Sequence, residues 1–173
     1  MASSAAVARR SSKNNMLTTL LWIAIIVATV ILDQVTKWLA VVNLKGEESV
    51  SIIGEILHFT YVENRGAAFG MMKDSRWVFM VISVIAIGAL IFYLIRFKPT
   101  SPLAIVSLAM IAGGGIGNMI DRVWLGYVVD FIYIKIIDFA VFNVADSFVC
   151  VGTALLVIYI LFFYREKPKE DKE

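Results

Sequence analysis

The chain has 173 residues, enough for one domain, and 60% of them are hydrophobic, with a mean hydropathy of +0.81. Only 17% are charged, against about 25% in average soluble domains, so the composition predicts an α-helical integral membrane protein. The net charge of +2 is too small to indicate a nucleic-acid partner. With a single cysteine, Cys150, and a single histidine, His58, we expect no intramolecular disulfide, no zinc or haem site, and no metal or other cofactor.

Four apolar segments are long enough to cross a bilayer as helices, which takes about 17–25 residues. They cover residues 16–32, with a continuation to about residue 42, and residues 77–95, 102–120 and 147–164. Together they predict one four-span domain over residues 16–164. Residues 1–15 are rich in Ala and Ser and carry three basic side chains. Because no small-residue cleavage site follows, we expect a disordered leader before an uncleaved first span. Residues 165–173 form a charged tail.

The Lys and Arg residues outside the spans predict the orientation. If the N-terminus is inside, nine of them lie on the inner side and five on the outer side, namely Lys45, Arg65, Lys73, Arg76 and Lys135. The inner segments are also the shorter ones. We therefore expect both termini in the cytoplasm and two loops, residues 43–76 and 124–141, outside.

The first outer loop, residues 43–76, contains two runs rich in β-branched and aromatic residues, at 49–53 and 56–62, separated by Gly54 and Glu55. This pattern predicts a β-hairpin and a small β-rich cradle outside the membrane. The polar turn and small residues at 63–70 allow a backbone or a ligand to approach closely. The second outer loop, residues 124–141, is apolar with few charges. It predicts a short interfacial segment, either a strand or a short helix.

Polar side chains near the outer end of the first span form one candidate group. Asp33 and Lys37 are four residues apart, so they share a helix face and can pair. The pair either keeps two charges together near the interface, or it orients a substrate or a neighbouring helix.

The segment 113–122 combines small residues with polar ones. Gly113 and Gly117 predict a face for close helix packing. Asn118, Asp121 and Arg122 follow on one side of the same helix. For Asp121 and Arg122 we favour a structural ion and hydrogen-bond cluster, because a neighbouring carboxylate offsets the desolvation of a permanently charged guanidinium.

Asp130 and Asp146 are candidates for a catalytic pair, because both can reach the same depth at the outer face. Two carboxylates close together share a proton, so that one activates water and the other protonates the reacting carbonyl or the leaving amine. Asn143 lies three residues before Asp146 and can hydrogen-bond to the pair. The alternative is that these aspartates cap the fourth helix and solvate the interface. The spacing alone leaves both interpretations open.

Five motifs occur in order along the chain: Asp33-Gln-x-Thr-Lys37, Asn64-x-Gly-Ala-Ala-Phe69, Gly113-Gly-x-x-Gly-Asn-x-x-Asp-Arg122, Val129-Asp-Phe131 and Phe142-Asn-x-Ala-Asp-Ser147. Each motif alone is weak, but five in order together with four spans are specific. Over about residues 16–164 the chain resembles the bacterial lipoprotein signal peptidases, the signal peptidase II family.

The resemblance implies a four-span aspartic endopeptidase of the bacterial inner membrane, with its active site towards the extracytoplasmic face. Such enzymes cleave the signal peptide from a prolipoprotein just before a cysteine that carries a diacylglyceryl group. The expected partners are these prolipoproteins, membrane lipids and inhibitory globomycin-type cyclic peptides. By the same resemblance Asp130 and Asp146 are catalytic. The residues that bind substrate or support the pair are Asp33, Lys37, Asn64, Gly66, Asn118, Asp121, Arg122 and Asn143.

Two other classes of protein remain as alternatives to a peptidase. A small proton-coupled transporter also places carboxylates in its spans, but nearer the middle of the membrane and often with internal repeats. Here the polar residues crowd one face and no repeat is evident. A scaffold protein does not need two acids and an asparagine that converge outside the membrane.

Overall fold

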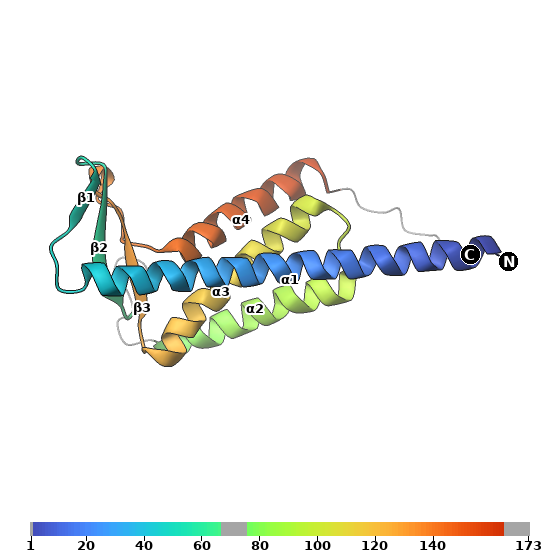
Figure 1. The fold of residues 1–173 in the computed structure, drawn as a ribbon, viewed down its shortest axis with the longest axis horizontal. Helices are drawn as coiled ribbons and strands as arrows, with labels where there is room; N and C mark the ends of the chain where they lie inside the picture. Colours follow the sequence, from blue (N-terminus) through green and yellow to red (C-terminus); the bar gives the residue numbers. More distant parts are fainter. Residues whose placement is uncertain (1, 67–75, 165–173) are drawn as a thin grey trace.

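The computed structural model describes residues 2–66 and 76–164 of the chain. In chain order its elements are α1 (Ala2–Leu44), β1 (Val50–Ile53), β2 (Leu57–Asn64), α2 (Arg76–Phe97), α3 (Pro102–Trp124), β3 (Val128–Ile134), the 3-10 helix η2 (Lys135–Ile137) and α4 (Val144–Phe162). The α-helices run side by side, and the strands lie across one end of them, where α1 ends and α4 begins (Figure 1).

In the described part of the chain, four helices are long and apolar enough to cross a membrane, over Asn15–Leu44, Met80–Phe97, Pro102–Trp124 and Val144–Phe162. The four predicted spans are therefore confirmed. Local chemistry determines where two of them begin. Pro102 lies in the first turn of α3, where its missing N–H removes no helical hydrogen bond, and Asn143 is the N-cap of α4. As a result α4 begins before the predicted residue 147 and contains Asp146 in its first turn.

The predicted leader differs from the structure. Helix α1 begins at Ala2, so residues 2–14, which we expected to be disordered, continue the helix ahead of the candidate span that starts at Asn15. Alanine has the highest helix propensity, and adding residues to a helix that has already formed is far easier than starting one. The charged tail, residues 165–173, lies outside the described residues.

The predicted hairpin of the first outer loop is confirmed. β1 and β2 pair antiparallel, and Gly54 between them has a φ of 45°, which glycine adopts without strain. The second outer loop adds β3 to the other edge of β2, so that Val62 lies opposite Asp130. The sequence left open whether this loop forms a strand or a short helix. It forms both, because η2 follows β3 directly. The result is one three-stranded antiparallel sheet in the order β1-β2-β3.

Helix α3 is the centre of the bundle, with 50% of its span buried, against 11% or less in the other three spans. Its predicted close-packing face is confirmed. A Cβ atom added to Gly113 would lie 2.8 Å from the Cβ of Thr29 in α1, and one added to Gly117 would lie 2.5 Å from Oδ2 of Asp33. Gly114 lies equally close to α4. The small residues of α3 therefore bring the polar side chains of α1 and α4 together from both sides.

Candidate active site

Asp130 and Asp146 meet at the sheet end of the bundle. Asp130 lies in β3 and is only 2% exposed, and Asp146 lies in the first turn of α4. Both line one pocket of about 530 Å³, a size typical of ligand-binding pockets. The same pocket is lined by polar and aromatic groups that include Asn64, Gly66, Arg122, Phe139, Phe142 and Ser147. The two candidate catalytic residues therefore share a cavity that also has an apolar wall.

Asn143 connects the two carboxylates. Its Nδ2 donates to Oδ1 of Asp130 at 2.6 Å, and its Oδ1 accepts from the backbone N–H of Asp146 at 2.9 Å. Its own backbone N–H donates to Oδ2 of Asp146 at 3.2 Å, which completes a capping box. Asp146 therefore caps α4 in the same geometry that turns it towards Asp130. The predicted hydrogen bonds of Asn143 to the pair are present.

Asn118 forms a second connection, and a buried lysine determines its orientation. Its Nδ2 donates to Oδ1 of Asp146 at 2.7 Å, and its Oδ1 accepts from Lys37 at 2.8 Å and from Asn143 at 3.0 Å. An ammonium group can only donate hydrogen bonds. The side-chain oxygen of Asn118 must therefore face Lys37, which leaves its NH₂ group to face Asp146.

Lys37 lies between two buried carboxylates. Its Nζ is 2.9 Å from Oδ2 of Asp33 and 3.0 Å from Oδ2 of Asp121, and all three side chains are 4% exposed or less. The predicted pair of Asp33 and Lys37 is present. A single cation shared by two carboxylates offsets part of the cost of burying them.

Asp121 finds its ion-pair partner on another helix and not at the neighbouring Arg122 as we predicted. Consecutive residues of a helix point roughly 100° apart and do not face each other directly. Asp121 faces Lys37 in α1, while Arg122 lines the pocket and donates to the backbone carbonyl of Asn118 at 3.3 Å. Arg122 therefore lines the same pocket as the two candidate catalytic aspartates, Asp130 and Asp146.

Gln34 and two backbone N–H groups also bond to the buried carboxylates of Asp33 and Asp121, and we did not predict these contacts from the sequence. Gln34 donates to Asp33 at 3.2 Å and to Asp121 at 3.0 Å. The backbone N–H of Ala145 donates to Asp33 at 2.9 Å, and that of Val129 donates to Asp121 at 3.0 Å. The position of Gln34 between Asp33 and Lys37 in the first motif was the available signal. No side-chain pattern can reveal the two backbone donors, which tie the starts of α4 and β3 to the cluster.

The pKa of Asp130 is raised to about 6, chiefly because burial disfavours its charged form and further because Asp146 carries a like charge. A hydrogen bond from Nδ2 of Asn64 to Oδ2 of Asp130, at 2.8 Å, opposes the rise. Oδ1 of Asn64 accepts from the backbone N–H of Gly66 at 3.0 Å, which fixes the orientation of this amide. The rest of the second motif, residues 67–69, lies outside the described residues.

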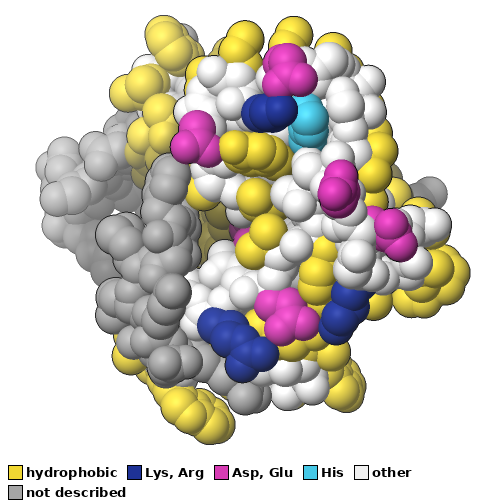
Figure 2. All heavy atoms as spheres, turned by 90° about the vertical axis from the view of Figure 1, so that its left-hand side faces the viewer, with side chains coloured by type: hydrophobic (Ala, Val, Ile, Leu, Met, Phe, Trp, Pro, Cys, Tyr) yellow, Lys and Arg dark blue, Asp and Glu magenta, His cyan; other side chains and the backbone are white. Residues whose placement is uncertain are grey.

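Charged side chains of both signs lie among hydrophobic ones on the face formed by the sheet end (Figure 2). Glu63 at the end of β2 accepts from Lys45 at 3.3 Å, from Arg65 at 3.2 Å and from the hydroxyl of Tyr61 at 3.2 Å. Arg65 first, and then Lys45, lower the pKa of Glu63. These contacts hold the chain on both sides of Asn64, the residue that reaches Asp130.

Comparison with known proteins establishes the family. The sequence profile described as Signal peptidase (SPase) II matches residues 25–162. The chain belongs to the signal peptidase II family. It is 49% identical over 144 residues to the lipoprotein signal peptidase of Geobacillus kaustophilus, covering 82% of this chain and 92% of that one. It is 50% identical over 141 residues to that of Caldanaerobacter subterraneus subsp. tengcongensis, covering 82% and 95%.

Two solved structures, each described as a bacterial membrane enzyme, share the fold of this signal peptidase II chain. Both align with a TM-score of 0.75, at 35% and 36% sequence identity. They cover 88% and 83% of this chain, and this chain covers 94% of each of them. With its four apolar helices, this member of the family is a multi-pass bacterial membrane protein and a membrane signal peptidase. The comparisons give no support to a transporter.

Proposed function

We propose that this chain is an aspartic endopeptidase that removes the signal peptide from diacylglyceryl-modified prolipoproteins, cleaving just before the lipidated cysteine. The observation that carries the proposal is the bridge made by Asn143. Its side chain bonds to Asp130 at 2.6 Å and to the N–H of Asp146 at 2.9 Å, within a pocket that both carboxylates line. The relatives described above are lipoprotein signal peptidases, which supports the same reaction for this chain.

In the proposed reaction Asp146 is the base and Asp130 the acid. Asp146 accepts hydrogen bonds on both oxygens, from Asn118 and from the backbone of Asn143, and for this reason we assign it the role of the base. Asp130 is more deeply buried, and its pKa is raised to about 6. Water loses a proton to Asp146 and attacks the scissile carbonyl carbon, while Asp130 protonates the carbonyl oxygen. The tetrahedral intermediate, which now carries two hydroxyls, then breaks its C–N bond as the leaving amine takes the proton from Asp146. One of the two hydroxyls returns its proton to Asp130, which leaves a carboxylic acid and restores both residues.

The remaining candidate residues have two proposed roles. Asn118, Asn143 and the buried cluster around Lys37 hold the two carboxylates in position; this cluster also contains Asp33 and Asp121. Asn64, Gly66 and Arg122 line the pocket and orient the substrate. The guanidinium of Arg122 carries fixed donors for a peptide carbonyl, and such donors stabilise the developing oxyanion most in a site with little water.

The substrate and the inhibitors that we propose agree with the character of the pocket. It has an apolar wall formed by Phe139, Val141 and Phe142, and it lies where the spans α3 and α4 meet the sheet. A lipidated cysteine presented from the bilayer can bring its acyl chains along apolar surface while its peptide bond reaches the carboxylates. Globomycin-type cyclic peptides would occupy the same pocket. From the distribution of Lys and Arg we propose that both termini are cytoplasmic and that the pocket opens to the extracytoplasmic side of the inner membrane.

Precursor processing by the purified full chain tests this function. The enzyme should cleave a prolipoprotein after diacylglyceryl transfer and should leave the unmodified precursor intact. Asp130→Asn and Asp146→Asn should each abolish cleavage while the protein keeps its thermal transition in detergent. Asp138→Asn is the matched control, because it makes the same change at an exposed aspartate whose left-handed φ of 47° asparagine tolerates.

The control variant should cleave at the wild-type rate. Full activity of Asp130→Asn or Asp146→Asn would overturn the assignment of the catalytic pair. Equal cleavage of the modified and unmodified precursors would overturn the proposed substrate while leaving the catalytic pair in place.

A further inference from the structure

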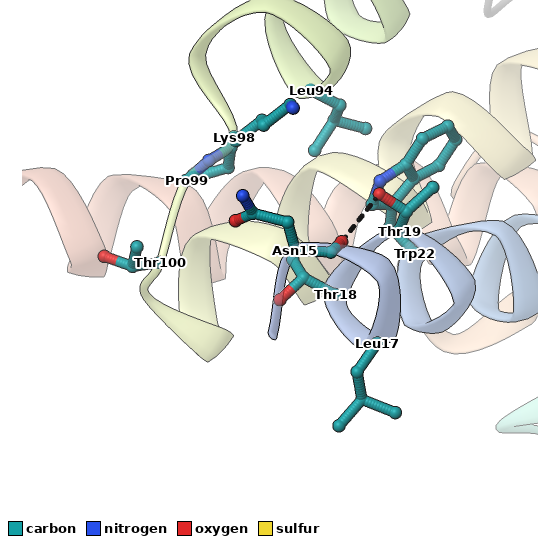
Figure 3. A pocket seen from close by; sticks show the side chains of 9 residues that line it. All are labelled: Asn15, Leu17, Thr18, Thr19, Trp22, Leu94, Lys98, Pro99 and Thr100. Carbon is teal, nitrogen blue, oxygen red and sulfur yellow. Dashed lines mark hydrogen bonds between the residues drawn. The ribbon is translucent and has the colours of Figure 1, made fainter. Parts of the chain in front are cut away.

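A second pocket, of about 270 Å³, lies at the end of the bundle away from the sheet. Helix α1 forms one side of it, and the connection between α2 and α3 forms the other. Figure 3 shows the side chain of Asn15 from α1 opposite Lys98 from this connection. The residues that determine its chemistry are Asn15, Thr18, Trp22, Leu94, Lys98 and Thr100.

The position of this pocket corresponds to one surface of the membrane. One candidate span begins at Asn15, which lines the pocket, and another ends at Phe97, next to Lys98. A third begins at Pro102, shortly after Thr100. Three spans therefore start or stop at the level of the pocket, which places it among lipid headgroups and not within the hydrocarbon. The sheet and the start of α4 lie at the opposite end of the bundle (Figure 1), and they carry Asp130 and Asp146 of the candidate active site.

The polar groups of the pocket are suited to an anion. Lys98 provides an ammonium group, Thr18 and Thr100 provide hydroxyls, Asn15 provides a carboxamide, and Trp22 provides an indole N–H that can only donate. The lining contains no carboxylate. The described residues of this half of the bundle, 2–32, 76–120 and 147–164, contain no Asp or Glu at all. A phosphate group would therefore find donors and a cation here without a competing negative charge.

The backbone at Lys98 adds a second observation. Its φ of 45° is left-handed, and only one other non-glycine residue among those described, Asp138, has a positive φ. This conformation is unfavourable for a residue with a Cβ, and glycine would adopt it freely. A long cationic side chain at a position that favours glycine indicates a use for that side chain.

We propose that this pocket binds the phosphate of an anionic phospholipid headgroup, in the leaflet on the far side of the membrane from the sheet. Basic pockets between membrane helices recognise such headgroups. The apolar parts of Trp22 and Leu94 in the pocket wall give the glycerol backbone and the upper acyl chain a surface to contact. Inorganic phosphate has the same chemistry, but the position at the ends of three spans favours the lipid. This proposal is independent of the catalytic assignment of Asp130 and Asp146.

Lipid binding by the delipidated full chain tests the proposal by native mass spectrometry in detergent. The probes are phosphatidylglycerol, zwitterionic phosphatidylcholine and inorganic phosphate. The compared proteins are the wild type, Lys98→Gln, Arg96→Gln and Thr18→Val. Arg96→Gln is the matched control, because it removes one positive charge from the same end of α2 without touching the pocket; its guanidinium lies over the Phe97 ring instead.

We expect the wild type to bind one phosphatidylglycerol more tightly than phosphatidylcholine. Lys98→Gln should weaken that binding roughly fivefold, and Arg96→Gln should change it little. Thr18→Val should weaken it without any change of charge. Equal losses in Lys98→Gln and Arg96→Gln would mean diffuse attraction and overturn the site. Phosphate bound as tightly as the lipid, and displacing it, would overturn the lipid as the ligand.

Discussion

Nζ of Lys37 in α1 lies 2.8 Å from Oδ1 of Asn118 in α3, in the interior of the bundle. This contact leaves the NH₂ group of Asn118 to donate to Asp146, and the other two contacts of Lys37 place its single positive charge between the carboxylates of Asp33 and Asp121. One buried cation thus combines two tasks. It pairs with two carboxylates that hold α4 and β3 in place, and it orients the amide that bonds to a proposed catalytic residue.

Replacing Lys37 should destabilise the fold far more than replacing an exposed lysine in a comparable ion pair. Lys37→Met leaves two buried carboxylates without their cation, which costs roughly 3–5 kcal/mol. Lys45→Met breaks an ion pair with Glu63 whose side chains are 52% and 30% exposed, so we expect a loss below about 1 kcal/mol. Thermal unfolding of both variants in the same detergent measures the difference. Equal transitions would contradict the role of the buried cation.

Asn118→Asp should reduce turnover in a protein that still folds, with a lower thermal transition because a further carboxylate joins the buried cluster. The new carboxylate keeps an oxygen for Lys37 but replaces the donor that faces Asp146 with an acceptor. Losing a hydrogen bond to a charged group is worth about 1.5–3 kcal/mol, which corresponds to a roughly ten- to hundredfold lower kcat. Asn43→Asp, an exposed position at the end of α1, is the control and should keep the wild-type kcat. The measurements are kcat and KM, determined separately for each variant, together with the thermal transition. An unchanged kcat for Asn118→Asp would exclude a role in turnover for the hydrogen bond from Asn118 to Asp146.

The rate of cleavage should fall as the pH rises through about 6. The pKa of Asp130 is raised to about 6, so this residue carries its proton below that pH and loses it above. If Asp130 is the acid, its deprotonation removes the proton needed by the carbonyl oxygen. The hydrogen bond from Asn64 lowers the pKa of Asp130, so Asn64→Ala should move the decline to higher pH. The pH dependence of kcat/KM for both proteins is the measurement. A shift to lower pH in Asn64→Ala would refute this assignment.

Alanine substitutions at two glycines should have opposite effects. A Cβ at Gly114 would lie 2.5 Å from the backbone carbonyl oxygen of Ala145, which cannot easily move, so Gly114→Ala should destabilise the protein by about 1–3 kcal/mol. A Cβ at Gly88 in α2 meets no atom within 4 Å. Gly88→Ala should be neutral or stabilise by roughly 0.5–1 kcal/mol, because alanine loses less freedom in a helix. Thermal unfolding tests both, and similar shifts would show that α3 and α4 are not held together by this close approach.

The sequence by itself determined the four spans and the hairpin, because each depends on a local pattern. An apolar run as long as the bilayer is thick is typical of a membrane-spanning helix. β-Branched residues on both sides of Gly54 favour a hairpin whatever the rest of the chain does. The small residues Gly113 and Gly117 likewise predicted close packing. The order of five motifs further identified the family, and the proposed pair of Asp130 and Asp146 came from the same resemblance.

Only the tertiary structure decided which polar groups meet. Asp121 pairs with Lys37, on a helix far away in sequence, and not with the adjacent Arg122, because the packing of α1 on α3 determines which faces oppose each other. The strand β3 pairs with the open edge of β2, a partner that the sequence of residues 124–141 by itself did not identify. The orientations of the Asn118 and Asn143 amides depend on partners from other elements. Hydrogen bonds and ion pairs are short-ranged, so their partners are determined only when the helices pack.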